Sequence, residues 1–230
     1  MGSDNLFHKR RREAKKNLQR GRAKRAAYDR VLIVCEGQKT EPNYLNELID
    51  TLRLNSANIE VDGGSDSSPD RLWLYAKRRY EDSKKQGDVY DRIYCVFDQD
   101  EHHHYQQTLQ AIGSAKPAAL FSAIPSVPCF EYWLLLHWSY STQPFYGVEG
   151  TSACDALVTE LKKHMPDYQK GEKGIFSRLM SQTDQAIAWS QKAVRQGKGV
   201  GSDNPSTLMH ELVLYLRALK ENIPHSKRSP

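Results

Sequence analysis

The chain has 230 residues, of which 39% are hydrophobic and 27% are charged, and its formal net charge is +5. This composition is typical of a folded globular protein and excludes an intrinsically disordered chain. No apolar run approaches the roughly 20 residues of a membrane-spanning helix, and the charged N-terminus lacks the apolar segment of a signal peptide. We therefore expect a cytoplasmic protein without a membrane partner.

Positive charge is concentrated at the start of the chain. Residues 1–30 contain eleven Lys or Arg against three acidic residues, whereas the remaining residues contain 22 basic and 25 acidic ones. Such a basic run suits contacts with nucleic-acid phosphates, which give affinity without base specificity. We predict a basic arm over residues 1–29; the alternative is a solvated tail. The expected nucleic-acid-binding residues are Lys9, Arg10, Arg11, Arg12, Lys15 and Lys16, together with Lys39 beyond the arm.

Residues 30–127 alternate between short apolar runs and amphipathic segments. Arg30–Cys35 and Arg92–Phe97 are mostly apolar and rich in β-branched residues, as buried parallel strands are. This alternation predicts a doubly wound α/β core with a mainly parallel sheet. The expected strands are Arg30–Cys35, Ile59–Val61, Arg92–Phe97 and Ala118–Ile124, separated by helices that begin at Thr40 and at Ser68-Pro69 and by a short helix that ends near Gly113.

Beyond residue 127 the pattern becomes helical, and we expect residues 128–230 to form a helical extension packed on the core. The expected helices are Phe130–Trp138, Thr151–Met165, Gln182–Gln196 and Ser206–Lys220, with a loop at Gly197–Gly201. In the last helix, Tyr215 and Leu216 are either exposed for a protein partner or packed on the sheet. Both alternatives stay open at this point.

Acidic residues follow two of the predicted strands. Asp98 and Asp100 come directly after Arg92–Phe97, and Glu36 comes directly after Arg30–Cys35. In an extended segment, residues two apart point to the same side, and ligands of α/β sheets gather beyond the carboxyl ends of the strands. Crowded carboxylates repel one another unless a cation neutralises them, and their oxygens suit Mg²⁺. We predict a Mg²⁺ or Mn²⁺ site formed by Glu36, Asp98 and Asp100.

These acids belong to longer motifs. The motifs are Val34-Cys35-Glu36-Gly37 with Thr40-Glu41, Val96-Phe97-Asp98-Gln99-Asp100-Glu101-His102, Pro128-Cys129-Phe130-Glu131-Tyr132-Trp133-Leu134-Leu135-Leu136-His137 and Asn204-Pro205-Ser206-Thr207. The three acids resemble those of the Toprim domain of topoisomerases, primases and overcoming-lysogenization-type nucleases. The whole pattern is similar to the RloB-like family over nearly all of the chain after the arm. That resemblance implies a Toprim-like fold, a place in restriction or abortive-infection loci, and a co-encoded ATPase as partner.

One position departs from the family pattern. Val127 stands before Pro128, where the family usually has asparagine. If that amide positions a phosphate or another ligand, its role is lost or altered in this chain. The acidic residues of the pattern are all present.

Three further residues are candidates for the site. An ionised Glu131 in an apolar helix needs a partner, so it is either a second-metal ligand or a carboxylate that caps the helix or pairs with an arginine. Glu41 is either a metal ligand or a first-turn acid favoured by the helix dipole. His102 matches the family pattern and is expected at the scissile phosphate or in proton transfer. His103 and His104 are expected to be solvated, and no zinc site is predicted.

Together these features predict metal-assisted hydrolysis of a nucleic-acid phosphodiester bond with one or two Mg²⁺ (or Mn²⁺) ions. The alternative is a non-catalytic Toprim-like nucleic-acid-binding or regulatory subunit of a defence complex. DNA and RNA both stay open as the substrate, and so does assembly into a homo-oligomer. The expected catalytic residues are Glu36, Asp98, Asp100, Glu131 and His102, and the expected metal ligands are Glu36, Glu41, Asp98, Asp100 and Glu131.

Overall fold

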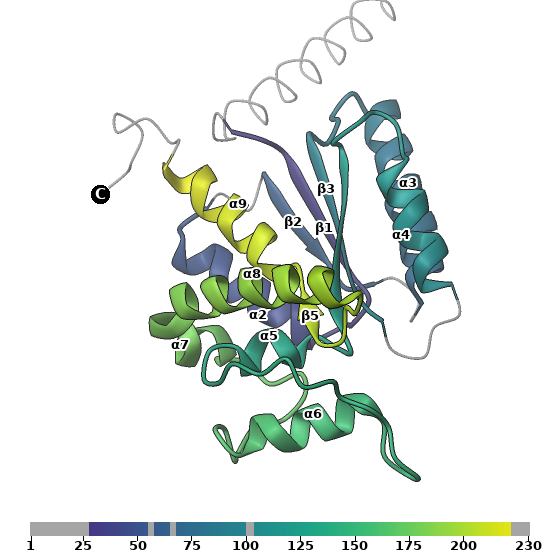
Figure 1. Cartoon of the computed structure of the whole chain (residues 1–230). Coiled ribbons are helices and arrows are strands. Elements are labelled where there is room, and N and C mark those ends of the chain that lie inside the picture. Colours follow the sequence, from purple (N-terminus) through teal and green to yellow (C-terminus); the bar gives the residue numbers. More distant parts are fainter. Residues whose placement is uncertain (1–27, 55–57, 65–67, 100–103, 222–230) are drawn as a thin grey trace, which may run out of the picture.

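The structure is a computed structural model that describes residues 28–54, 58–64, 68–99 and 104–221. Within these residues, five strands form one sheet in the order β2-β1-β3-β4-β5 (Figure 1). The first four strands pair in parallel, and β5 is antiparallel to β4. The strands are β1 (Val31–Cys35), β2 (Ile59–Asp62), β3 (Arg92–Asp98), β4 (Phe121–Val127) and β5 (Ser206–Thr207).

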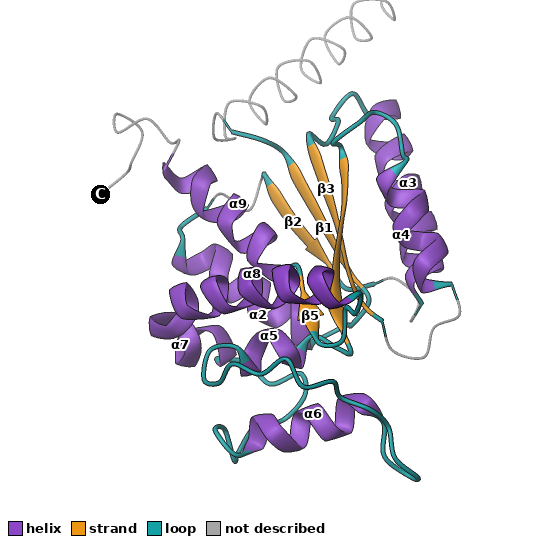
Figure 2. Cartoon of the chain, in the orientation of Figure 1, coloured by secondary structure: helices purple, strands orange, loops and turns teal. Residues whose placement is uncertain are grey.

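Helices cover both faces of this sheet (Figure 2). α3 and α4 lie on one face, and α2, α5, α8 and α9 lie on the other. The predicted α/β fold with a mainly parallel sheet is confirmed, and the arrangement is compatible with a doubly wound topology. None of the helices described is both long and apolar enough to cross a membrane. The helices are α2 (Thr40–Thr51), α3 (Pro69–Lys85), α4 (Tyr105–Gly113), α5 (Glu131–Leu135), α6 (Ala153–Lys162), α7 (Ile175–Leu179), the 3₁₀ helix η1 (Met180–Gln182), α8 (Thr183–Val200) and α9 (Met209–Glu221).

The side chains of β1 alternate between two hydrophobic cores. Val31, Ile33 and Cys35 face α2 and the C-terminal helices, whereas Leu32 and Val34 face α3 and α4. A strand that is buried on both faces needs an apolar residue at every position, and β1 has one throughout. Both cores therefore hold the carboxyl end of β1, and the residue that follows it, in a fixed place.

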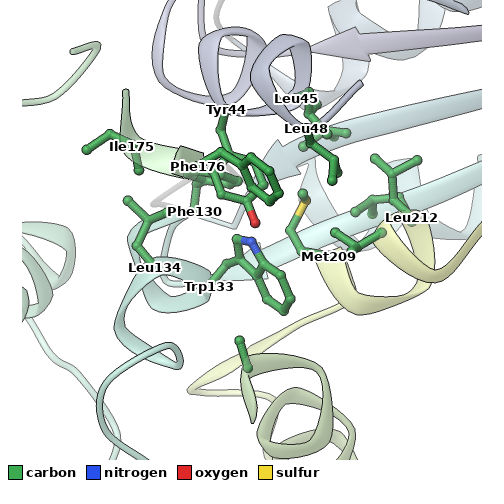
Figure 3. Packing of buried hydrophobic residues seen from close by; sticks show 14 of the residues in the cluster. Tyr44, Leu45, Leu48, Phe130, Trp133, Leu134, Ile175, Phe176, Met209 and Leu212 are labelled. Atoms are coloured by element: carbon green, nitrogen blue, oxygen red, sulfur yellow. The ribbon is translucent and has the colours of Figure 1, made fainter. Parts of the chain in front are cut away.

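The core on the α2 side joins the sheet to the helices that follow β4 (Figure 3). Tyr44 of α2 packs edge-to-face on Phe130 and on Phe176, with ring centroids 5.6 and 5.3 Å apart. Trp133 of α5 and Met209 of α9 lie in the same cluster. Because aromatic side chains bury large apolar areas, these contacts bind the segment beyond residue 127 tightly to the sheet.

Strand β4 is shifted relative to the prediction. It spans Phe121–Val127, not Ala118–Ile124. Pro125 lies inside the strand although proline has no backbone N–H to donate to a sheet. The shift matters for the site, because it makes Ser126 the register partner of Asp98 on β3.

Helices after residue 127 also differ in part from the prediction. α5 is five residues long and does not reach the expected Trp138, and α7 and η1 are short helices that the sequence pattern does not indicate. Gly197–Gly201, expected as a loop, instead forms the last turn of α8, and Gly201 is its left-handed C-terminal cap.

The C-terminal segment contributes a strand before its helix. Ser206 and Thr207 pair with β4, so the helix expected from Ser206 begins at Met209. The Thr207 hydroxyl accepts a hydrogen bond from the Met209 N–H (3.1 Å), which satisfies one of the free N–H groups at the helix start. The hydroxyl side chains of this segment therefore favour a strand and a cap over a further helical turn.

The side chains that we considered for a partner surface on α9 are engaged within the chain. Leu216 is fully buried. The Tyr215 hydroxyl donates a hydrogen bond to Asp29 (2.7 Å), and the Tyr215 ring lies 5.2 Å from that of Tyr94 on β3. The expectation of an exposed Tyr215–Leu216 pair is wrong, and its alternative, packing on the sheet, is correct.

Candidate functional site

Two acidic residues lie side by side at the carboxyl edge of the sheet. Glu36 follows β1, and Asp98 is the last residue of the neighbouring parallel strand β3. The Asp98 N–H donates a hydrogen bond to Glu36 Oε2 (3.1 Å). The Glu36 N–H donates to the Val96 carbonyl oxygen (3.0 Å), which continues the ladder between the two strands. The structure thus brings together the two predicted site residues that follow different strands.

Glu41 reaches the same edge from the first turn of α2. Its side chain is 5% exposed and folds back against Gly37. A Cβ atom at residue 37 would overlap the Glu41 carboxylate, so glycine is the residue that leaves room for it. The sequence Glu36-Gly37 therefore places one carboxylate at the strand end and makes space for a second beside it.

Glu131, the first residue of α5, is 2% exposed. Its Oε1 atom accepts a hydrogen bond from the Tyr168 hydroxyl (3.0 Å) and lies 3.4 Å from Lys170 Nζ. An ionised carboxylate at this depth needs such partners. Burial lowers the pKa of Lys170, but Glu131, together with Cys129 and Cys154, raises it by more, so that the pKa lies above its ordinary value.

Tyr168 and Lys170 are site residues that the sequence motifs do not indicate. The alternative considered for Glu131 was a helix cap or an arginine partner, and the partners are instead a lysine and a tyrosine. Both precede α7 in a loop with no regular hydrophobic pattern. The signal that could have found them is the general need of a buried carboxylate for a cation.

Electrostatic coupling joins four carboxylates, Glu36, Glu41, Asp98 and Glu131, which we call the acid cluster. Burial raises the pKa of Glu41 to about 7; backbone N–H groups oppose the shift, and Glu131 and Glu36 add to it. Burial also raises the pKa of Asp98 well above its ordinary range, and Glu41, Glu131 and Glu36 raise it further. Like charges this close disfavour ionisation, so the cluster attracts cations.

The family model for RloB-like proteins matches residues 31–216. The chain belongs to the RloB-like family. No curated protein matches it. Family membership suggests a protein associated with restriction or abortive infection, and the matched range includes every member of the acid cluster together with Tyr168 and Lys170.

Val127, where the resemblance to the family leads us to expect asparagine, is part of the hydrophobic core. Val127 is 1% exposed and packs on the α3 and α4 side of the sheet. Its backbone pairs with Ser206 of β5. The polar contact beside Val127 comes from Ser126, whose hydroxyl forms a 2.9 Å hydrogen bond with the Thr207 hydroxyl. Val127 therefore contributes packing, and hydroxyl groups bridge β4 and β5.

Several predicted site residues of this RloB-like chain lie outside the described residues. They are Asp100, His102, His103 and the basic residues Lys9, Arg10, Arg11, Arg12, Lys15 and Lys16. Lys39 is described: it is exposed at the N-cap of α2. His104 is also exposed, as expected, and its Nδ1 lies 3.2 Å from Gln107 Oε1.

The donor set of the acid cluster fits a hard divalent cation, because Mg²⁺ and Mn²⁺ prefer carboxylate oxygens. Within residues 28–54, 58–64, 68–99 and 104–221, no three Asp, Glu, His or Cys side chains are placed so that they hold a metal ion together. The expected third ligand, Asp100, falls in the gap after residue 99. The raised pKa of Asp98 is the observation that favours a cation here.

Glu41 gives the site a measurable pH dependence. Its pKa is about 7 in the folded protein and near 4.5 in the unfolded chain, so the folded state binds this proton more tightly. Protonation of the Glu41 carboxyl group therefore stabilises the folded state. This stabilisation is fully present below about pH 4.5 and is lost as the pH rises towards 7. We expect metal-free Glu41→Gln to be more stable than wild type by about 1–3 kcal/mol at pH 8 and equally stable at pH 4.

Urea unfolding of both proteins at pH 4, 6 and 8 measures this difference. The matched control is Glu81→Gln, which removes an exposed carboxylate from α3 and should leave stability nearly unchanged at all three pH values. A constant difference between Glu41→Gln and wild type across this range would show that Glu41 ionises normally in the folded protein.

Proposed function

We propose that this RloB-like protein is a metal-dependent nuclease that hydrolyses nucleic-acid phosphodiester bonds at a Toprim-type site. The observation that carries the proposal is the contact between Asp98 and Glu36 at the carboxyl edge of a parallel sheet, with the buried Glu41 and Glu131 near enough to raise the pKa of Asp98. Buried acids that raise the pKa values of Glu41 and Asp98 are costly in a purely structural role. A metal ion that acts on a phosphate would offset this cost and explain why the carboxylates lie together.

In this proposal Glu36, Asp98 and Asp100 hold Mg²⁺ or Mn²⁺, and Glu41 and Glu131 hold a second ion if two are used. A bound ion supplies charge neutralisation at the phosphoryl group and lowers the pKa of a bound water. Glu36 accepts the proton of the attacking water, and His102 acts in proton transfer to or from the scissile phosphate.

The chain's own residues prepare this chemistry. The Tyr168 hydroxyl fixes one oxygen of Glu131. Lys170 is about half exposed, so its ammonium group reaches both Glu131 and solvent. It balances charge in the metal-free protein and can turn to a phosphate oxygen when substrate arrives.

A second candidate function is a non-catalytic nucleic-acid-binding or regulatory subunit of a defence complex. Two observations favour it: the described acids do not form a three-residue metal group, and Glu131 already has a cation partner. In either case we propose an anti-phage role with a co-encoded ATPase as partner, which follows from the family association. Because Leu216 is buried, that partner is not expected to bind through this side chain.

Cleavage and metal binding by the purified protein separate the two functions. We expect wild type to cleave at least one of supercoiled plasmid, single-stranded DNA and tRNA when Mg²⁺ or Mn²⁺ is present, and none of them in EDTA. Glu36→Ala should lose both cleavage and most of the calorimetric metal-binding signal, whereas the exposed control Glu81→Ala should keep both. A protein that binds these nucleic acids but cuts none of them with either ion would support the non-catalytic subunit.

A further inference from the structure

Helix α8 carries a run of positive charge without any acid. From Gln185 to Val200 the chain contains no Asp or Glu, and its charged residues are Lys192, Arg195 and Lys198. All three are exposed and follow one another at intervals of three residues, so they occupy successive turns of the helix. The chain beyond its first 30 residues has more acidic than basic residues, which makes this surface an exception.

Several basic residues on other helices are paired with acids nearby. Among them are the pairs Lys84–Glu81 (3.2 Å), Lys85–Asp82 (3.0 Å), Lys163–Glu160 (2.6 Å) and Arg178–Asp167 (2.8 Å). Within the described part of the chain, Lys192, Arg195 and Lys198 form no ion pair. Their charge is therefore available to an anionic partner.

Aromatic side chains lie beside these cations. Lys192 Nζ is 4.3 Å from the centre of the Tyr140 ring, and that ring is 6.0 Å from the ring of Trp189. The Tyr140 hydroxyl donates a hydrogen bond to the side-chain oxygen of Gln196, which fixes the ring against α8. Further along the same extended segment, Tyr146 is 69% exposed. Tyr140 and Trp189 are partly exposed, and cations interleaved with rings that solvent can reach are the composition of single-strand binding surfaces.

The buried side of α8 is tied to the edge of the sheet that bears the acid cluster. The Ser190 hydroxyl donates to the Thr207 carbonyl oxygen (2.8 Å), and the Thr207 hydroxyl lies 2.9 Å from that of Ser126. Ser126 is in turn the register partner of Asp98. Figure 1 shows the C-terminal end of α8 beside β5. These bonds fix α8 relative to the end of β3 that carries Asp98.

We infer that the Lys192–Arg195 face of α8, together with Tyr140, binds the phosphates and bases of a single-stranded nucleic acid. The inference rests on the proposed function, since the bound strand is the one to be cut. Phosphates contact Lys192 and Arg195, and a base stacks on the Tyr140 ring. The surface contains few groups that read base edges, so it accepts many sequences.

The test is binding of the full-length protein to fluorescent 20-nucleotide oligo-dT, oligo-U and a 20-base-pair duplex, measured in EDTA. We expect Lys192→Glu/Arg195→Glu to weaken binding to at least one single strand by tenfold or more. The slope of log affinity against log salt should fall by about 1.4, since each single-strand phosphate contact contributes about 0.7. Tyr140→Leu should weaken binding several-fold, whereas Tyr140→Phe, which keeps the ring, should bind like wild type.

The matched control is Lys77→Glu/Arg78→Glu, which makes the same charge change at exposed residues of α3 on the other face of the sheet. Equal losses in the two double variants, or no loss from the α8 variant, would overturn the inference. A loss confined to duplex binding would also overturn it, because the surface would then serve a different nucleic acid. The assay contains no metal, so failed cleavage with intact α8-dependent binding contradicts the nuclease proposal alone.

Discussion

Replacing Asp98 by asparagine is expected to reduce metal-dependent cleavage by about 10³-fold or more, which corresponds to roughly 4 kcal/mol of lost transition-state stabilisation. Asparagine has nearly the same shape but no charge, so it weakens the hold on a divalent cation. We expect the stability of the metal-free protein to stay the same or to increase. Burial and neighbouring acids already raise the pKa of Asp98, and the neutral amide relieves that repulsion.

Two measurements on purified protein check this expectation. The cleavage rate at saturating Mg²⁺ should fall, while the melting temperature of metal-free Asp98→Asn at pH 8 should equal or exceed that of wild type. Asp82→Asn on α3 removes a carboxylate that pairs with Lys85 near the surface and serves as the control. If Asp98→Asn cleaves at the wild-type rate, Asp98 is not a metal ligand, and the proposed function loses its central residue.

Glu131→Gln is expected to lower kcat by about 100-fold while KM changes little, the pattern of an interaction made only in the transition state. Glutamine keeps a side-chain oxygen that can accept the hydrogen bond from Tyr168, so the fold should be retained. Removing Lys170, the cationic partner of Glu131, is expected to lower stability more than Glu131→Gln does. Lys170→Met leaves a carboxylate that is 2% exposed without its cation, and we expect it to destabilise the metal-free protein by about 1–2 kcal/mol, less than for a fully buried pair because Lys170 is half exposed.

Urea unfolding and steady-state kinetics on both variants separate catalysis from structure. Lys163→Met, which removes an exposed lysine paired with Glu160, controls for the loss of one positive charge. If Glu131→Gln unfolds at lower urea but cleaves at the wild-type rate, Glu131 has a structural role only. Added Mg²⁺ should restore more stability to Lys170→Met than to the control, because the ion replaces the missing charge.

The part of the site that follows the strands could be predicted from the sequence. Apolar runs of β1 and β3 indicate buried parallel strands, and parallel neighbours bring their carboxyl ends to one edge. Glu36 and Asp98 therefore had to be close, and a hydrogen bond joins them. At the ends of β1 and β3 the sequence changes from apolar to acidic residues, which is why a short stretch of sequence suffices to place these two ends.

Tyr168 and Lys170 could not be predicted in this way, because tertiary contacts place their loop. Asn43 of α2 donates a hydrogen bond from its side chain to the Gly171 carbonyl oxygen (2.9 Å), and Glu47 accepts one from the Phe176 N–H (3.0 Å). These partners are separated by more than a hundred residues in sequence. No periodic pattern reports such a contact.

Strand β5 escaped prediction for a different reason. It is two residues long, too short for any alternation of apolar and polar residues to be recognised. The pairing of Ser126 with Thr207 depends on the shifted end of β4, which the sequence pattern places three residues too early. The roles of Asp100, His102 and the basic arm stay predictions, since these residues lie outside the described part of the chain.

The two residues of β5 also limit which backbone groups of β4 another molecule can bind. Ser206 and Thr207 pair with backbone groups at the end of β4. Without this pairing, those N–H and C=O groups would be free along the side of the sheet. Open edges accept strands from other chains, which leads to domain swapping or aggregation. If β5 leaves, a strand from a second copy that takes its place lies next to the partner of Asp98 on β4. This two-residue strand thus protects the end of β4 beside Ser126, the register partner of Asp98.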